Sequence, residues 1–166
     1  MLRYKIIVTY DGTNFEGWQI QNNSRTIQGE LEDALKIINN NKSIKIFGSG
    51  RTDSGVHAIA QVAHFDFDFK ERSKFDLKNA INGNLPKEIR ITNCEIVPSN
   101  FHARFSALSR SYKYKIRTNY NIFDKNYTWR VGKLNFSLLN ELASMIIGAH
   151  DFTSFSKISS NLESRK

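Results

Sequence analysis

A glycine-rich stretch at residues 48–58 carries the side chains best suited to chemistry. Its sequence, GSGRTDSGVHA, places one carboxylate, Asp53, two positions after one guanidinium, Arg51. Three glycines within eight residues permit a tight, exposed loop with unusual backbone angles. Such a loop can present Asp53 as a nucleophile, and a neighbouring cation favours the ionised form that attacks. On these residues alone a second interpretation is open, in which Asp53 caps backbone amides in a well-made turn.

Two further stretches combine aromatic, basic and amide side chains. Residues 10–21 read YDGTNFEGWQIQ, and residues 101–107, FHARFSA, precede the segment RSYKY at 110–114. Because basic side chains form ion pairs with phosphates and aromatic rings stack on unpaired bases, this composition is typical of RNA-binding segments. Tyr112 is a candidate for such contact, because a core prefers Phe unless the hydroxyl has a partner. Core packing is the favoured interpretation for the other large aromatic residues here, namely Phe15, Trp18, Phe101 and Phe105.

Positive charge is concentrated in the second part of the chain. Residues 1–100 carry 13 Lys and Arg against 12 Asp and Glu, whereas residues 101–166 carry 11 against 4, a net charge of +7. This asymmetry predicts that one part of the molecule binds a polyanion, although many of the lysines could serve only to solvate the surface. Arg104, Arg110 and Lys113 are the candidate RNA contacts.

The chain lacks the motifs of the common cofactor sites. It has no phosphate-binding lysine loop, no Gly-x-Gly-x-x-Gly after a strand, and no Cys/His cluster with metal spacing. We therefore expect no metal, nucleotide or redox cofactor. His57 and His102 are interpreted as loop residues that position RNA or hold turns.

The N-terminus predicts a cytoplasmic protein. Residues 1–11 read as a strand containing Arg3 and Lys5, without the apolar core and small-residue cleavage site of a signal peptide. The longest apolar runs are far too short to span a membrane.

Hydrophobic periodicity predicts the elements that must position the glycine-rich loop. The third expected strand alternates, with Ala63, Phe65, Phe67 and Phe69 on the core face and His64, Asp66 and Asp68 on the other. The order β-α-β-β-α-β predicts an α+β, ferredoxin-like fold, an antiparallel sheet with helices on one face. The expected strands are 2–11, 44–49, 61–69 and 89–97, and the expected helices are 26–40, capped by Thr26, and 76–82, capped by Asp76.

A second unit of the same kind is expected to begin at residue 106. We predict a strand over 111–118 with Tyr112 on one face and Lys113 on the other, a strand over 127–131, and a helix capped by Ser137 and closed by Gly148. The expected domains are therefore residues 1–105, which contain the Asp53 loop, and residues 106–166, an incomplete second α/β domain.

Six motifs together resemble the TruA family of tRNA pseudouridine synthases. The family carries Tyr-Asp-Gly…Gly-Trp-Gln-x-Gln, Gly-Arg-Thr-Asp-x-Gly-Val-His-Ala, Asn-x-x-Leu-Pro, Phe-His-Ala-Arg-Phe-Ser-Ala, Arg-x-Tyr-x-Tyr and Asp-Phe-Thr-Ser-Phe. No single motif is specific, but six in order over nearly the whole chain are highly specific. They match residues 10–21, 50–58, 82–86, 101–107, 110–114 and 151–155.

The resemblance implies an activity and a role for each matched residue. It implies that uridine is isomerised to pseudouridine at tRNA positions 38, 39 and 40, in the anticodon stem-loop, by a homodimer that holds one tRNA across both subunits. Asp53 matches the catalytic aspartate, and Arg51 matches the arginine that helps to expel the target base. Tyr112 matches the tyrosine that packs against the uracil and is proposed to help remove the C5 proton.

Two expectations qualify this interpretation. The family continues into a segment that completes the second domain and holds a basic partner for the aspartate, so residues 1–166 alone are expected to be inactive. The competing interpretation is a non-catalytic RNA-binding module of ferredoxin-like fold, which the basic second part also fits. Such a module has no need of Asp53 in a basic, glycine-rich loop, and the aromatic signature of RRM domains is absent.

Overall fold

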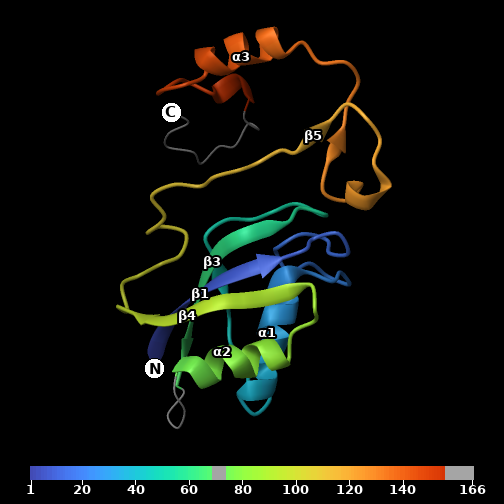
Figure 1. The fold of residues 1–166 in the computed structure, drawn as a ribbon. Helices are drawn as coiled ribbons and strands as arrows, with labels where there is room; N and C mark the ends of the chain where they lie inside the picture. Colours follow the sequence, from blue (N-terminus) through green and yellow to red (C-terminus); the bar gives the residue numbers. More distant parts are fainter. Residues whose placement is uncertain (69–73, 156–166) are drawn as a thin grey trace. The chain divides into compact units, whose positions relative to one another are not determined.

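In the computed structural model, which describes residues 1–68 and 74–155, the chain forms two units, Met1–Ser111 and Tyr112–Lys166. The first unit contains a four-stranded antiparallel sheet with the strand order β2-β3-β1-β4. Figure 1 shows β3, β1 and β4 side by side. This order and the sequence of elements confirm the predicted α+β, ferredoxin-like arrangement. The elements are β1 (Leu2–Tyr10), α1 (Ile27–Ile38), β2 (Phe47–Gly48), β3 (Ala58–Phe67), α2 (Lys74–Gly83) and β4 (Ile89–Val97).

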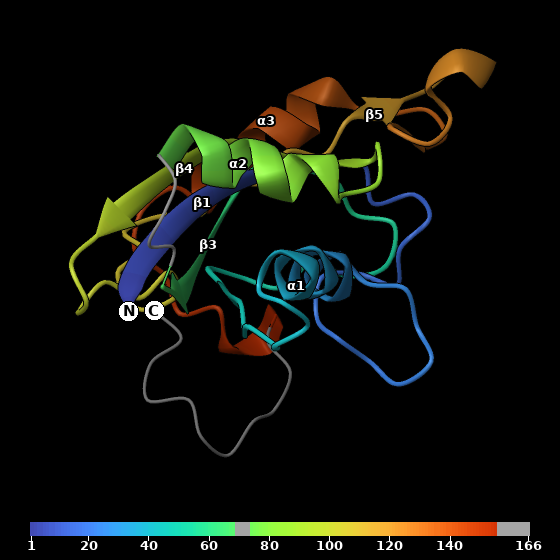
Figure 2. The same cartoon turned by 90° about the horizontal axis from the view of Figure 1, so that it is seen from below.

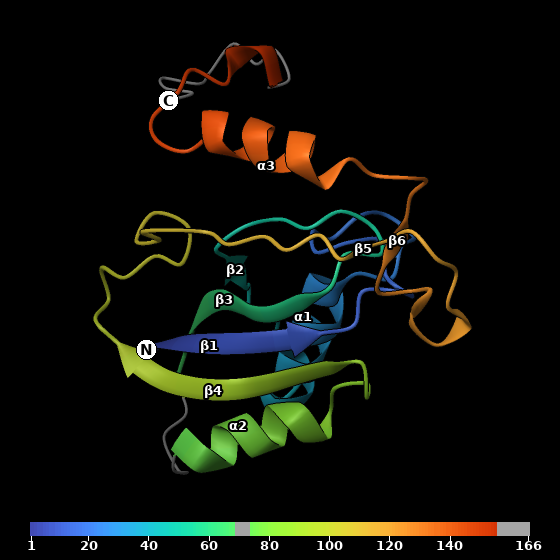
Figure 3. The same cartoon turned by 45° about the horizontal axis from the view of Figure 1, so that its top comes forward.

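Both helices of the first unit lie on the same face of its sheet, as Figures 2 and 3 show from two directions. The alternation of β1 sends Tyr4, Ile6, Val8 and Tyr10 into the core, where they meet apolar side chains of α1 and α2. Leu31 is fully buried, and burying a side chain of this size contributes ~1.5–3 kcal/mol. The side chain of Thr26 caps α1 by accepting a hydrogen bond from the Gly29 amide at 3.2 Å, as expected.

Strand β2 is much shorter than the expected strand at residues 44–49. The reason lies in α1, whose Glu32 carboxylate accepts from the Ile46 backbone amide at 3.0 Å, while the Gln28 side-chain amide donates from Nε2 to the Ile46 carbonyl at 3.2 Å. With its backbone groups satisfied by side chains, Ile46 needs no strand partner. The expected cap at Asp76 was wrong, because α2 already begins at Lys74. Phe69, expected on the core face of β3, lies outside the described residues.

His64 is buried, although its alternation in β3 predicted an exposed position. The chain after β4 folds back over the sheet, and the Ala103 amide donates to Nδ1 of His64 at 3.1 Å. Ala103 is itself buried. The first unit therefore extends to Ser111, six residues beyond the expected boundary at 105.

The second unit is built from short elements. Strands β5 (Ile116–Arg117) and β6 (Trp129–Arg130) pair in parallel, and helix α3 spans Phe136–Met145. The expected strand at 111–118 shrinks to two residues, Ile116 and Arg117, which pair with β6, while residues 111–115 belong to no strand in the described part of the chain. Asn135, not Ser137, caps α3, since its side chain accepts from the Leu138 amide at 3.1 Å. In the described ranges, no helix is long and apolar enough to cross a membrane.

Candidate active-site loop

The loop that carries Asp53, residues 49–57 between β2 and β3, is braced by the loop that follows β1. The Trp18 amide donates to the Thr52 carbonyl at 3.0 Å. The Phe15 carbonyl accepts from both the Gly55 amide and the Ser54 hydroxyl, each at 3.2 Å. The motifs at 10–21 and 50–58 therefore form one structural unit, in which the first supports the second.

Two glycines of the supporting loop allow this close approach. A Cβ on Gly12 would collide with the Val56 carbonyl, and a Cβ on Gly17 would lie 2.5 Å from the Thr52 carbonyl oxygen. Gly17 also has a φ of +87°, in the left-handed region that favours glycine. Without these glycines the two backbones could not meet as they do.

Side chains add three contacts between the loops. The hydroxyls of Tyr10 and Thr52 lie 2.9 Å apart, and burial raises the pKa of Tyr10 while the Thr52 hydrogen bond opposes this. Nδ1 of His57 lies 3.2 Å from the Gly12 amide nitrogen and 3.0 Å from an oxygen of Asp11. The His57 ring thus links the loop after β1 to the Asp53 loop.

Asp53 occupies the first position of a tight turn. The Val56 amide donates to the Asp53 carbonyl at 3.2 Å, and Gly55 has a φ of +76°, the geometry of a type II turn. The Asp53 side chain is exposed, and in the part of the chain that the structure describes its carboxylate accepts no hydrogen bond and joins no ion pair. This geometry differs from the capping alternative, because the backbone of Asp53 closes the turn while the carboxylate points free of it.

Arg51 is also exposed and, in the described ranges, its guanidinium has no hydrogen-bond or ion-pair partner. The residue between Arg51 and Asp53, Thr52, is held through both its carbonyl and its hydroxyl. The loop therefore fixes its backbone while leaving one cation and one carboxylate available to a ligand.

The loop also has a fixed beginning. The Ser49 amide donates to the Val62 carbonyl at 2.7 Å, and the Gly50 carbonyl accepts from the Gln61 side-chain amide at 2.6 Å. Arg110, a candidate RNA contact, donates from Nε and Nη2 to the Ser49 carbonyl at 3.1 and 2.7 Å. Sequence reasoning missed Gln61, because only the pairing of β2 with β3 brings it to the loop.

The turn at residues 101–106 forms an aromatic cluster over β2 and β3. The ring of buried His64 lies 4.6 Å from that of His102, and burial is the main cause that lowers the pKa of His64 from 6.5 to about 4. Phe15 and Trp18 are buried, as expected, but core packing was the wrong prediction for Phe105, which is 77% exposed. The turn buries Ala103 instead and directs Phe105 outward, where its ring centroid lies 5.8 Å from the guanidinium of Arg104.

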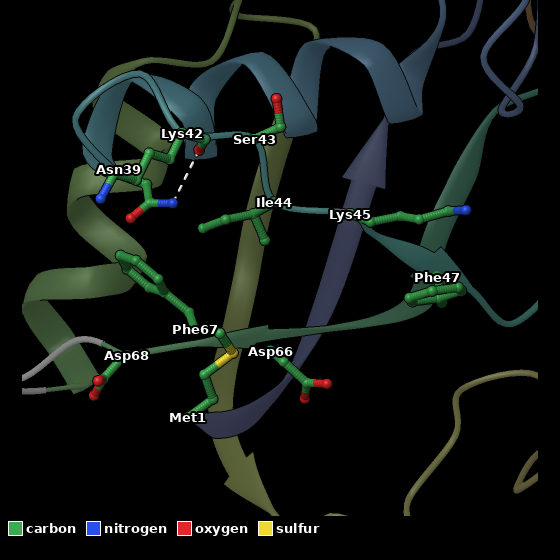
Figure 4. A pocket seen from close by; sticks show the side chains of 10 residues that line it. All are labelled: Met1, Asn39, Lys42, Ser43, Ile44, Lys45, Phe47, Asp66, Phe67 and Asp68. Atoms are coloured by element: carbon green, nitrogen blue, oxygen red, sulfur yellow. Dashed lines mark hydrogen bonds between the residues drawn. The ribbon is translucent and has the colours of Figure 1, made fainter.

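The remaining candidates, Tyr112 and Lys113, belong to the second unit, where both side chains are exposed. A shallow pocket of the first unit lies between the end of α1 and the end of β3 (Figure 4). It contains both acidic and basic residues but none from residues 49–57, so it is no part of this loop. Residues 1–68 and 74–155 contain no group of three or more His, Cys, Asp or Glu side chains placed to hold a metal ion.

Known proteins of one family resemble this chain over most of its length. Residues 6–106 match the family model described as tRNA pseudouridine synthase. Over 99% of its length the chain is 41% identical to tRNA pseudouridine synthase A of Maridesulfovibrio salexigens, covering 61% of that protein. Over 93% it is 48% identical to the protein of the same name from Rhodopseudomonas palustris, covering 64%. The chain thus spans a little over three fifths of the length of the curated relatives it matches.

Proposed function

The chain belongs to the tRNA pseudouridine synthase family, and from that premise we propose that the protein converts uridine to pseudouridine in tRNA with Asp53 as nucleophile. One observation carries the proposal: the loop is braced on both sides, yet the carboxylate of Asp53 is exposed and, among the described residues, unbonded. A nucleophile needs a fixed backbone and a free carboxylate, because it must be held in place while its oxygen lone pairs accept no hydrogen bonds from the protein.

The reaction is an isomerisation that consumes no second reactant. The N1–C1′ bond of uridine breaks, the uracil rotates, and a C5–C1′ bond forms; C5 then loses a proton and N1 gains one. A carboxylate oxygen of Asp53 forms a covalent bond to the substrate, either at C1′ as the N1–C1′ bond breaks or at C6 as the C5=C6 double bond is consumed, and that bond breaks again before the product leaves. Neither a redox partner nor an activated cosubstrate is needed.

Arg51 is proposed to assist in extruding the target base. A base within a stem must leave its stack before a side chain can reach it, at a cost of a few kcal/mol. Arg51 is exposed two residues before Asp53, so a guanidinium can enter the space that the base leaves. We assign it this role, and we assign Tyr112 the role of stacking on the extruded uracil and assisting removal of the C5 proton.

The substrate proposed is the anticodon stem-loop of tRNA, with target positions 38, 39 and 40, bound by a cytoplasmic homodimer. The exposed side chains of Arg104 and Lys113 are proposed to contact its phosphates. His57 contributes indirectly, by holding the loop that approaches the RNA.

The test compares full-length wild-type protein with Asp53→Asn. Tritium release from tRNA labelled at C5 of uridine reports turnover, and tRNA affinity is measured in parallel. We expect Asp53→Asn to abolish release while changing affinity little, because one oxygen is replaced by nitrogen at an exposed site. Clear turnover by the variant would refute the nucleophile, whereas tRNA binding without turnover by the wild type would favour a non-catalytic RNA-binding module.

A further inference from the structure

The beginning of the Asp53 loop depends on two side chains from outside it. The carbonyls of Ser49 and Gly50 are the last two before Arg51. Each accepts a hydrogen bond from a side chain instead of a strand's backbone amide. Arg110 holds the first and Gln61 the second. Gln61 also lies 3.3 Å from the Ser49 hydroxyl, so that it spans both residues.

The hydrogen bonds that Arg110 donates within the protein leave its guanidinium poorly able to bind a phosphate. Its Nε donates to Ser49, and its Nη2 donates both to Ser49 and to the Arg104 carbonyl at 3.2 Å. A guanidinium has five N–H donors, and bidentate recognition uses either the Nε/Nη2 edge or the Nη1/Nη2 edge. Since Nη2 donates on both of its sides, neither edge is fully available, and among the described residues only Nη1 has no acceptor.

Gln61 provides an independent observation of the same kind. It is only partly exposed and stands in β3, directly across from the start of the loop. Its side-chain amide reaches the Gly50 carbonyl at 2.6 Å. The middle and the end of the loop are braced by the segment at 10–18, but among the described residues its beginning is braced by Gln61, Arg110 and the Ser49–Val62 backbone bond.

We propose that Gln61 and Arg110 are positioning residues for pseudouridine formation, which set the place of Arg51 and Asp53 by fixing the two carbonyls that precede them. This rests on the proposed function. Arg110 acts through the protein backbone and is not a principal phosphate contact. Because a reacting group misplaced by about 1 Å costs roughly 10²-fold in rate, loss of either hydrogen bond lowers the chemical rate more than it lowers tRNA affinity.

The experiment uses full-length protein carrying Gln61→Met, Gln61→Glu, Arg110→Met or Arg110→Lys. Single-turnover rates are measured with enzyme in excess over tRNA, and tRNA affinity is measured from about 50 to 200 mM salt. Lys36→Met removes one exposed positive charge from α1 and is the matched control for charge. Thermal melting identifies any variant that does not fold.

We expect Gln61→Met and Arg110→Met to lower the single-turnover rate roughly ten- to hundred-fold. Their slopes of log tRNA affinity against log salt should equal that of the Lys36→Met control. Arg110→Lys should recover part of the rate, because an ammonium can still donate to one carbonyl. Gln61→Glu should not, because its carboxylate cannot donate to Gly50. A normal rate at saturating tRNA with a salt slope reduced by about one unit would identify Arg110 as a phosphate contact and overturn the proposal. Equal rates for Gln61→Glu and wild type would overturn it for Gln61. A wild type that forms no pseudouridine would refute the proposed function instead.

Discussion

Acidification should loosen the first unit through one residue, His64. Its pKa is lowered from 6.5 to about 4, first by burial and then by His102. The unfolded chain therefore binds a proton that the folded chain resists, so stability is fully present above about pH 6.5 and is lost as the pH falls toward 4. Asp66 does not obscure this window, because its hydrogen bond with Arg3 lowers its pKa below its ordinary value of 3.8.

The size of the effect follows from the two pKa values. A fall from about pH 7 to about pH 5 removes ~2 kcal/mol of stability, and complete protonation removes ~3 kcal/mol at most. Protonation at Nδ1 would also break the bond from the Ala103 amide, so the turn at 101–106 should loosen in the same pH range.

The assay is urea unfolding of wild type and His64→Gln at the two pH values, followed by tryptophan fluorescence. Both proteins carry Trp129→Phe, so that buried Trp18 is the reporter and the signal belongs to the first unit. Gln does not titrate, so the difference between the proteins isolates His64 from other groups. We expect the wild type to lose ~2 kcal/mol more than His64→Gln on acidification. An equal loss of unfolding free energy in both proteins would refute the claim that protonation of His64 destabilises the first unit.

Three further predictions concern the loop and the RNA. Gly17→Ala should cost ~1–3 kcal/mol of stability and most of the turnover, because the added Cβ would collide with the Thr52 carbonyl at a strained φ. Gly83→Ala is the control, since a Cβ there meets no atom within 4 Å, and equal melting temperatures of the two variants would contradict the prediction. Tyr112→Phe should retain most tRNA affinity, since stacking is worth ~1–3 kcal/mol, but lose most turnover; a wild-type tritium-release rate would make Tyr112 a stacking platform only. Lys113→Met should lower the slope of log affinity against log salt by about one unit, and an unchanged slope would show that Lys113 contacts no phosphate.

Local patterns predicted β1, β4, most of β3 and the Thr26 cap of α1, because alternation and capping depend on neighbours in sequence, but the Asp76 cap of α2 was wrong. They failed at His64 and Ile46, where partners distant in sequence, Ala103 and Glu32, decide burial and backbone pairing. The strand at 111–118 failed for a related reason, since a strand is defined by a partner that local sequence does not name.

The candidate site shows the same division. The Gly-Arg-Thr-Asp pattern identified Asp53 and Arg51 without any structure. The pattern could not decide whether the Asp53 carboxylate caps a turn. That depends on whether other groups accept the hydrogen bonds of the loop's backbone amides, as the Phe15 carbonyl accepts from the Gly55 amide. Nor could it find Gln61, whose bond to Gly50 spans eleven positions and forms only when β2 pairs with β3.

Detecting the covalent bond between Asp53 and the substrate would show directly that Asp53 is the nucleophile. Full-length protein is incubated with tRNA that carries 5-fluorouridine at the target position, where fluorine cannot leave as a proton does and the reaction halts before release. Denaturing electrophoresis and peptide mapping by mass spectrometry then locate the RNA on the protein. We predict one adduct on the peptide that contains Asp53 and no adduct in the Asp53→Asn variant. An adduct that persists in Asp53→Asn, or that maps to another residue, would contradict it.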